Sequence, residues 1–410
     1  MPKIRTALVV GGGIAGPVVA MALQQAGIDA TIYEAHPTSS DRQGSFLTLA
    51  TNGIRALRAV GADQRVVAGG FSTPKILLRS TTGKNLGEVP LGIALPDGTS
   101  SHTLKRADLY QAIREEAVHR DITFEHGKRL INIEHASAGV RAIFEDGSDA
   151  AGDVLIGADG VHSVVRRMID VAAPAPTYSG LIGLGGYARD MQVEADPGDY
   201  IMMFGKKAFF GYVLAPSREV WWFANVPVRD EPRGDMLHRL APQGWQRRLV
   251  ELFADDAGPA ASLVRETYPA DIMRPTVIHS IPHLPRWHDD RVTVIGDAAH
   301  APTPTSGQGA SLAIEDALVL AKCLRDRRDP QLAFQSFESL RRRRVERIIK
   351  AAARTNSNKA AGGAARVLRD AMLPMMLKMM TNSKRAMEPY DYDIDWDASV
   401  SQEVQPLTTR

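Results

Sequence analysis

The chain has 410 residues, 44% of them apolar and 23% charged, and a formal net charge of +2. This composition is typical of a globular protein with roughly two or three domains, and the nearly balanced charge gives no reason to expect nucleic-acid binding. The single cysteine, Cys323, excludes an intrachain disulfide and a cysteine-based metal site, and no metal is expected. Because the N-terminus also lacks a signal-peptide pattern, we expect a cytoplasmic protein.

The N-terminal residues predict a dinucleotide-binding βαβ unit. A strand over residues 4–10 leads into Gly11, Gly13 and Gly16, which complete a G-x-G-x-x-G motif, and Glu34 closes a second strand after the intervening helix. In such a unit the glycines allow a tight turn, admit a pyrophosphate and let the helix pack against the strand, while the acid binds the adenosine ribose. The alternative is a glycine-rich turn with an incidental glutamate. The motif does not distinguish NAD from FAD.

Helices and short strands alternate in the region that follows. We expect helices over 52–60 and 106–119, and a hairpin over 75–95. A further strand at 153–156 leads into Gly157-Ala158-Asp159-Gly160, with arginines one helical turn later. A carboxylate on such a turn suits a site for phosphate and ribose, but Asp159 could equally cap the next helix, and the residues alone favour the cap.

The pattern changes between about residues 173 and 275, where alternating runs indicate an antiparallel sheet with one covered face. Aromatic residues concentrate in these runs, and they either form the wall of a pocket or fill a core. We expect Met202, Phe210 and Trp222 to line a substrate pocket. The predicted strands are 181–189, 200–205, 209–214 and 219–227.

The stretch from Arg291 to Leu324 predicts a second ligand site. A β-branched strand ends at Gly296-Asp297, and a proline-containing loop leads to Gly307-Gln308-Gly309, which opens an apolar helix. The free N–H groups of a helix start, beside two glycines, can receive an electron-rich group such as an isoalloxazine with its ribityl chain. A plain strand–loop–helix connection has the same pattern.

The C-terminal region predicts helices and an acidic tail. One long helix is expected over 332–354, with Arg341 to Arg344 on a solvated face. A second helix would run to about Met380, and its methionine-rich part is too short to span a membrane. The tail 390–397 alternates aromatic and acidic residues, so it is either an extended segment docked by its rings or a solvated end.

Together the three glycine-containing motifs resemble the single-component FAD-dependent monooxygenases of the p-hydroxybenzoate hydroxylase type, which include urate-hydroxylating and tetracycline-inactivating enzymes. The resemblance covers essentially the whole chain. It implies an α/β fold with a Rossmann-like FAD-binding domain, an inserted antiparallel β-sheet substrate domain and C-terminal helices. The implied FAD-binding domain is 1–75, 101–172 and 276–330, the substrate domain is 76–100 and 173–275, and the helices and tail are 331–410.

The resemblance also implies roles for single residues. Glu34 would bind the adenosine ribose, and Arg42 would lie by the flavin and the nicotinamide path. Arg106 would reach the FAD ribose and phosphate, and Asp297 the ribityl chain. Many relatives have asparagine where this chain has Ser311, whose hydroxyl can still donate a hydrogen bond to the flavin. The implied cofactor-binding residues are Gly11, Gly13, Ile14, Ala15, Gly16, Glu34, Ala35, Arg42, Arg106, Leu130, Asp159, Asp297, Pro304, Gly307, Gln308, Gly309, Ala310 and Ser311.

The implied activity is oxygenation of a small aromatic or polyketide-like substrate by O2, with non-covalent FAD, NAD(P)H as co-substrate and a flavin C4a-hydroperoxide. A separate NADPH domain is not expected, since no second G-x-G-x-x-G occurs. The alternatives are a flavin reductase or dehydrogenase, a flavin halogenase of the same fold, and a non-enzymatic FAD-binding scaffold. The halogenase motif Trp-x-Trp-x-x-Ile-Pro is represented only by Trp221-Trp222. Substrate identity, the choice of NADH or NADPH, and the oligomeric state stay open.

Overall fold

The computed structural model describes residues 4–38, 45–136, 139–359, 372 and 387–400. Its centre is a parallel sheet with the strand order β18, β12, β1, β2, β8. Strands β1, β12 and β18 are largely apolar and buried, because other layers cover both faces of a parallel sheet at its centre. Their bounds are Thr6–Val10 for β1, Asp29–Glu34 for β2, Thr123–His126 for β8, Val154–Gly157 for β12 and Val292–Val294 for β18. The predicted Rossmann-like sheet is confirmed.

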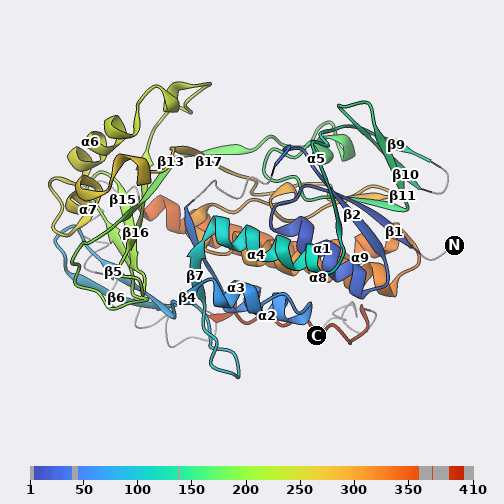
Figure 1. Ribbon diagram of the computed structural model, residues 1–410, viewed down its shortest axis with the longest axis horizontal. Helices are drawn as coiled ribbons and strands as arrows, with labels where there is room; N and C mark the ends of the chain where they lie inside the picture. Colours follow the sequence, from blue (N-terminus) through green and yellow to red (C-terminus); the bar gives the residue numbers. More distant parts are fainter. Residues whose placement is uncertain (1–3, 39–44, 137–138, 360–371, 373–386, 401–410) are drawn as a thin grey trace.

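Two layers cover this sheet (Figure 1). Helices α1 (Ala15–Gln25), α8 (Gly309–Asp326) and α9 (Pro330–Lys359) lie on one side. The antiparallel strands β9 (Leu130–His135), β10 (Val140–Phe144) and β11 (Asp149–Gly152) lie on the other. Every residue of α8 from 311 to 324 is buried, so the start of this helix is the part that can meet a ligand.

A seven-stranded sheet forms the other half of the molecule, in the order β17, β13, β16, β15, β14, β5, β6 (Figure 1). Its neighbouring strands are antiparallel, except that β14 and β5 are parallel. The bounds are Lys75–Arg79 for β5, Asn85–Pro90 for β6, Thr177–Ala188 for β13, Tyr200–Phe204 for β14, Phe209–Leu214 for β15, Val220–Pro227 for β16 and Thr276–Ser280 for β17. The inserted sheet is thus confirmed. It extends past residue 275, and the division of the chain into three parts stays a prediction.

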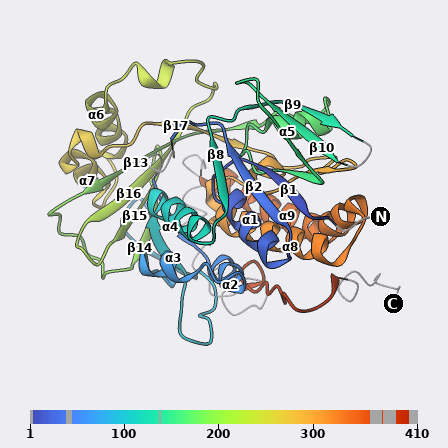
Figure 2. The ribbon, with the colours of Figure 1, turned by 45° about the vertical axis from the view of Figure 1, so that its right-hand side comes forward.

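Helices that the alternating pattern does not predict, α6 (Pro242–Phe253) and α7 (Ala260–Glu266), cover the outer face of this sheet (Figure 2). The opposite face meets a small sheet formed by β3 (Phe46–Leu49), β7 (His102–Lys105) and β4 (Phe71–Ser72). The sheet therefore has one face closed by helices and one face directed to the other half of the molecule. The remaining elements are α2 (Thr51–Ala59), α3 (Gln64–Ala68), α4 (Arg106–His119), α5 (Val164–Ile169) and the short turns η1 (Met236–His238), η2 (Pro269–Asp271), η3 (Gly296–Ala298) and η4 (Pro304–Ser306).

The C-terminal segment 387–400 is docked by its rings, which was one of the two predicted possibilities. Its acidic side chains are exposed while the side chains between them are half-buried, and the Trp396 ring lies under the guanidinium of Arg325. The second C-terminal helix falls almost entirely outside the described residues. Among the helices that the structure does describe, none is long and apolar enough to cross a membrane.

Candidate functional site

In the G-x-G-x-x-G turn one glycine faces open space, and backbone atoms pack closely against the other two. Gly11 has a φ of 108°, and a Cβ there would lie 2.4 Å from the carbonyl oxygen of Ala158. A Cβ on Gly16 would lie 1.9 Å from the carbonyl oxygen of Gly11, so only glycine fits either position. At Gly13 nothing lies within 4 Å of an added Cβ. Gly13 therefore faces open space at the start of α1, which suits an approaching pyrophosphate.

Glu34 lies beside this turn at the end of β2. Its carboxylate accepts hydrogen bonds from the N–H groups of Gly12 and His36, at 2.8 and 2.9 Å. The N–H of Lys128 donates to the Glu34 carbonyl at 2.8 Å, which brings the chain leading to the buried Leu130 next to the same strand end. The predicted cofactor-binding residues of the N-terminal unit thus lie around one end of the parallel sheet, with Ile14 and Ala15 at the start of α1 and Ala35 after β2.

The start of α8 presents unpaired hydrogen-bonding groups. Gly307 has a φ of 60° and follows the turn η4, which begins at Pro304. The side chains of Gln308 and Ser311 are each 1% exposed, and Gln308 Nε2 and Ser311 Oγ have no hydrogen-bond partner among the described residues. Buried polar atoms are normally paired. These two atoms, with the free N–H groups of the first helical turn, fit a polar ligand such as the flavin of FAD.

Asp297 and Arg106 come from distant parts of the chain, and their charges influence each other at this site. Asp297 lies on η3, directly after β18. Burial raises the pKa of the Asp297 carboxyl, and the charges of Arg106 and His300 oppose that increase. Arg106 begins α4; its N–H donates to the Ser45 carbonyl and its Nε donates to the Tyr110 hydroxyl, both at 2.8 Å. The site therefore combines a carboxylate, a guanidinium and a helix start, which suits a ribityl chain with phosphates.

Asp159 caps the start of α5, as the residues alone had favoured. Its Oδ2 accepts hydrogen bonds from the N–H groups of Val164 and Val165, at 2.7 and 3.2 Å. Burial raises the pKa of this carboxyl despite these donors. Because Oδ1 has no partner within the described part of the chain, a ligand contact stays a prediction. Arg42 lies outside the described residues.

The predicted pocket wall is wrong for Phe210 and Trp222. Both are 0% exposed and lie in the core under α6 and α7, where Phe210 stacks on Trp222 and its ring centroid is 5.1 Å from that of Phe253. Trp222 donates from Nε1 to Thr267 Oγ1 at 2.9 Å. Met202 pairs with Gly211, so it faces the opposite side from Phe210, since neighbouring residues of a strand alternate.

The face that carries Met202 holds a different aromatic cluster. Phe46 of β3 contacts Trp221 and Phe223 of β16, with ring centroids 5.8 and 6.1 Å apart. Met202 and Phe223 pack against this cluster and are half-buried. The Lys105 ammonium lies 4.5 Å from the Tyr187 ring centroid. This face, and not the one with Phe210, is available to line a site between the two halves of the molecule.

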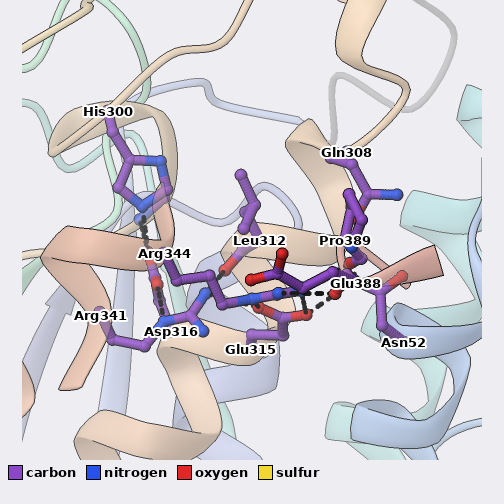
Figure 3. Close-up of polar contacts among 11 residues, drawn as sticks. Asn52, His300, Gln308, Leu312, Glu315, Asp316, Arg341, Arg344, Glu388 and Pro389 are labelled. Carbon is purple, nitrogen blue, oxygen red and sulfur yellow. Dashed lines mark hydrogen bonds and ion pairs between the residues drawn. The ribbon is translucent and has the colours of Figure 1, made fainter. Parts of the chain in front are cut away.

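Several residues that pattern analysis does not identify support the site (Figure 3). Asn52 contacts Gln308 and Glu315, and Asp316 accepts hydrogen bonds from the N–H of Gly296 at 3.0 Å and from His300 Nε2 at 2.5 Å. Gly296 directly precedes Asp297, so Asp316 fixes the turn that carries the residue predicted to bind the ribityl chain. A paired Glu-Asp inside an apolar helix is the signal that could have drawn attention to them. Within the described ranges, no cluster of His, Cys, Asp or Glu could hold a metal.

Comparisons with known proteins find similar sequences and a similar fold. Residues 5–352 match the model of the FAD binding domain family. The chain is 30% identical over 346 residues to the aurachin C monooxygenase/isomerase of Stigmatella aurantiaca, covering 84% of this chain and 87% of that protein. It is 32% identical over 357 residues to the 3-amino-4-hydroxybenzoate 2-monooxygenase of Streptomyces cremeus, covering 84% and 85%. The crystal structure of Klebsiella pneumoniae HpxO with FAD and uric acid has a TM-score of 0.80 and 25% identity, over 93% of this chain and 97% of that one.

Proposed function

The chain belongs to the family of FAD-dependent aromatic monooxygenases, and from this premise we propose that it uses NAD(P)H and O2 to oxygenate a small aromatic or polyketide-like substrate. In the balanced reaction, substrate, O2, NAD(P)H and a proton give hydroxylated product, NAD(P)⁺ and water. When bound, FAD would supply the redox chemistry, by taking hydride from NAD(P)H and activating O2 in the form that the resemblance implies, a flavin C4a-hydroperoxide.

The start of α8 is the observation that carries this proposal. Gln308 Nε2 and Ser311 Oγ are buried there without partners in the described structure, beside the backbone of Gly309 and Ala310. A helix N-terminus stabilises a nearby negative charge by about 0.3–1 kcal/mol when exposed and up to about 2 kcal/mol when partly buried. The negative charge that FAD gains on reduction is of this kind, so the arrangement favours a redox cofactor.

The other residues would bind, orient and exclude water. Glu34 would accept the ribose hydroxyls at the adenosine end, and Arg106 and Asp297 would hold the ribityl and phosphate part. The half-buried face with Met202 and Phe223 would cover the substrate, because the oxygen donor is wasted as hydrogen peroxide where water reaches it. The relatives named above carry aromatic substrates in their names, which supports a planar aromatic ring as the substrate class.

We test the proposal with the purified FAD-loaded protein, NADH or NADPH, and a panel of aromatic compounds. The panel contains urate, 3-amino-4-hydroxybenzoate, simple phenols and an aromatic polyketide. We expect at least one compound to stimulate NAD(P)H oxidation and O2 uptake together, and its product to contain oxygen from isotopically labelled O2. NAD(P)H oxidation that never transfers label to any organic product would identify a reductase instead.

We also propose that FAD is bound non-covalently and that the protein is cytoplasmic. The single cysteine, Cys323, is buried in α8, about four helical turns after Gln308, which makes attachment there implausible on distance alone. Acid precipitation should therefore leave the yellow colour in the supernatant. Colour that stays in the washed pellet would contradict the non-covalent assignment.

A further inference from the structure

A cluster of buried charges joins α8 to α9 (Figure 3). Glu315 and Asp316 are adjacent on α8, and Arg341 of α9 contacts both carboxylates at 2.7 Å; all three side chains are 0% exposed. Arg344 adds hydrogen bonds from Nε and Nη2 to Glu315, at 2.9 and 2.8 Å. With two guanidinium groups beside it, the Glu315 carboxylate only accepts hydrogen bonds.

This charged acceptor determines how the neighbouring amides must point. The Asn52 amide reaches Glu315 Oε1 at 2.7 Å, and because Glu315 cannot donate, the Asn52 atom that faces it must be Nδ2. The same Nδ2 lies 2.9 Å from the Gln308 amide, so its second hydrogen is donated to Gln308 Oε1. Which end of an amide is oxygen and which is nitrogen is normally ambiguous. Here Glu315 sets the orientation of the Asn52 amide, and Asn52 in turn sets that of the Gln308 amide. Gln308 is left with its Nε2 donor facing away from Asn52.

The hydrogen bonds that join Glu315, Asn52 and Gln308 leave two buried polar atoms without partners among the described residues. Both Asn52 Oδ1 and Gln308 Nε2 lack a hydrogen-bond partner among the described residues, and the two side chains are 0% and 1% exposed. Holding unpaired polar atoms away from water costs free energy, so an apolar pair would stabilise the fold better. The close packing of α2 on α8, where a Cβ on Gly53 would lie 2.6 Å from Ser311 Oγ, keeps this arrangement at the start of the cofactor helix.

We propose that Asn52 is a positioning residue that, held by Glu315, fixes the Gln308 amide so that Nε2 is presented as a hydrogen-bond donor to FAD. The inference rests on FAD binding at the start of α8. A donor in this position stabilises electron-rich groups more than electron-poor ones, and FAD is more electron-rich when reduced. Asn52 therefore acts on cofactor affinity and on the midpoint potential without touching FAD.

Asn52→Asp is the sharpest test, because the substitution keeps the shape and removes both donated hydrogens. The new carboxylate would accept from Gln308 Nε2 and withdraw that donor from FAD. Asn52→Ala, which adds no charge beside Glu315, carries the same test if Asn52→Asp does not fold. Gln308→Met removes the amide itself, and Asn132→Asp on the exposed part of β9 is the matched control.

We measure FAD affinity of the apoprotein by fluorescence titration, the midpoint potential of bound FAD, and the melting temperature without FAD. Both Asn52→Asp and Gln308→Met should weaken FAD binding about tenfold, the upper range for one hydrogen bond, and make the potential more negative. The double variant should be no weaker than either single variant, because the two residues act as one unit.

Two results would overturn the inference while leaving FAD binding by the wild-type protein intact. One is an unchanged affinity and potential in folded Asn52→Asp or Asn52→Ala. The other is additive losses in the double variant, which would mean that Asn52 acts independently of Gln308. A wild-type protein that takes up no FAD would instead contradict the proposed function itself.

Discussion

The two faces of the seven-stranded sheet are made by the same strands but have different surroundings. On one face, Phe210 and Trp222 are fully buried under α6 and α7, and the Trp222 N–H is paired with Thr267. On the other, Met202 and Phe223 are half-buried and pack towards Phe46 of the other half of the molecule. Bulky aromatic residues therefore do not by themselves indicate a pocket wall. We expect the wall of the substrate site on the face that keeps partial exposure and packs towards the other half of the molecule.

The largest expected effect is a difference in the free energy of unfolding between substitutions on the two faces of the sheet. Phe210→Ala should lower the free energy of unfolding by about 3–5 kcal/mol, the usual cost of removing a buried phenylalanine ring. Phe223→Ala should cost less, because its side chain is already partly exposed and less buried apolar area is lost. Denaturant titration of the two variants measures both values. Equal losses would show that the second face is as closed as the first.

Features that depend on neighbouring residues could be predicted from the sequence. The turn with Gly11, Gly13 and Gly16, the end of β2 at Glu34, and the start of α8 near Gly309 are local, and the structure has each element within a few residues of its predicted bounds. Helix α4 (Arg106–His119) has the predicted bounds, since apolar spacing is a local signal.

Features that depend on distant partners could not be predicted. Alternation shows that a strand has two faces, but the choice between Met202 and Phe210 depends on where α6 and α7 pack. Asn52 meets Gln308 and Glu315 across 256 and 263 residues of chain. The arginine run 341–344 was expected on a solvated face, which is wrong for Arg341, since its side chain is fully buried and paired with two carboxylates of α8. No single segment contains these pairings.

We expect FAD affinity to depend on Asp297 and Glu34 and not on either face of the seven-stranded sheet. Asp297→Ala should weaken FAD binding by about 1–3 kcal/mol, the range for a lost hydrogen bond involving a charged group, and Glu34→Ala should do so at the adenosine end. Met202→Ala and Phe210→Ala should leave the FAD affinity of the folded protein unchanged. Titration of the apoproteins with FAD measures all four. A normal affinity in both acidic-residue variants would contradict the placement of FAD between η3 and the end of β2.

Neighbouring methionines face opposite sides of β14, so the same substitution at both positions compares the two sheet faces. Met203 is 2% exposed and belongs to the core under α6 and α7, whereas Met202 is half-buried on the face with Phe46 and Phe223. Met203→Ala should therefore destabilise the fold by about 2–5 kcal/mol and leave the reaction coupled. Met202→Ala should cost less stability, because a partly exposed side chain has less buried area to lose.

If the Met202 face covers the substrate, shortening this side chain admits water and diverts reducing equivalents to hydrogen peroxide. We expect a few-fold rise in peroxide formed per NAD(P)H in Met202→Ala, with FAD still bound and NAD(P)H oxidation still running. The same ratio in Met203→Ala is the internal control, since it is the same substitution one residue along the strand. A rise in Met203→Ala alone would reverse the assignment of the two faces, and a rise in neither variant would remove β14 from the substrate site.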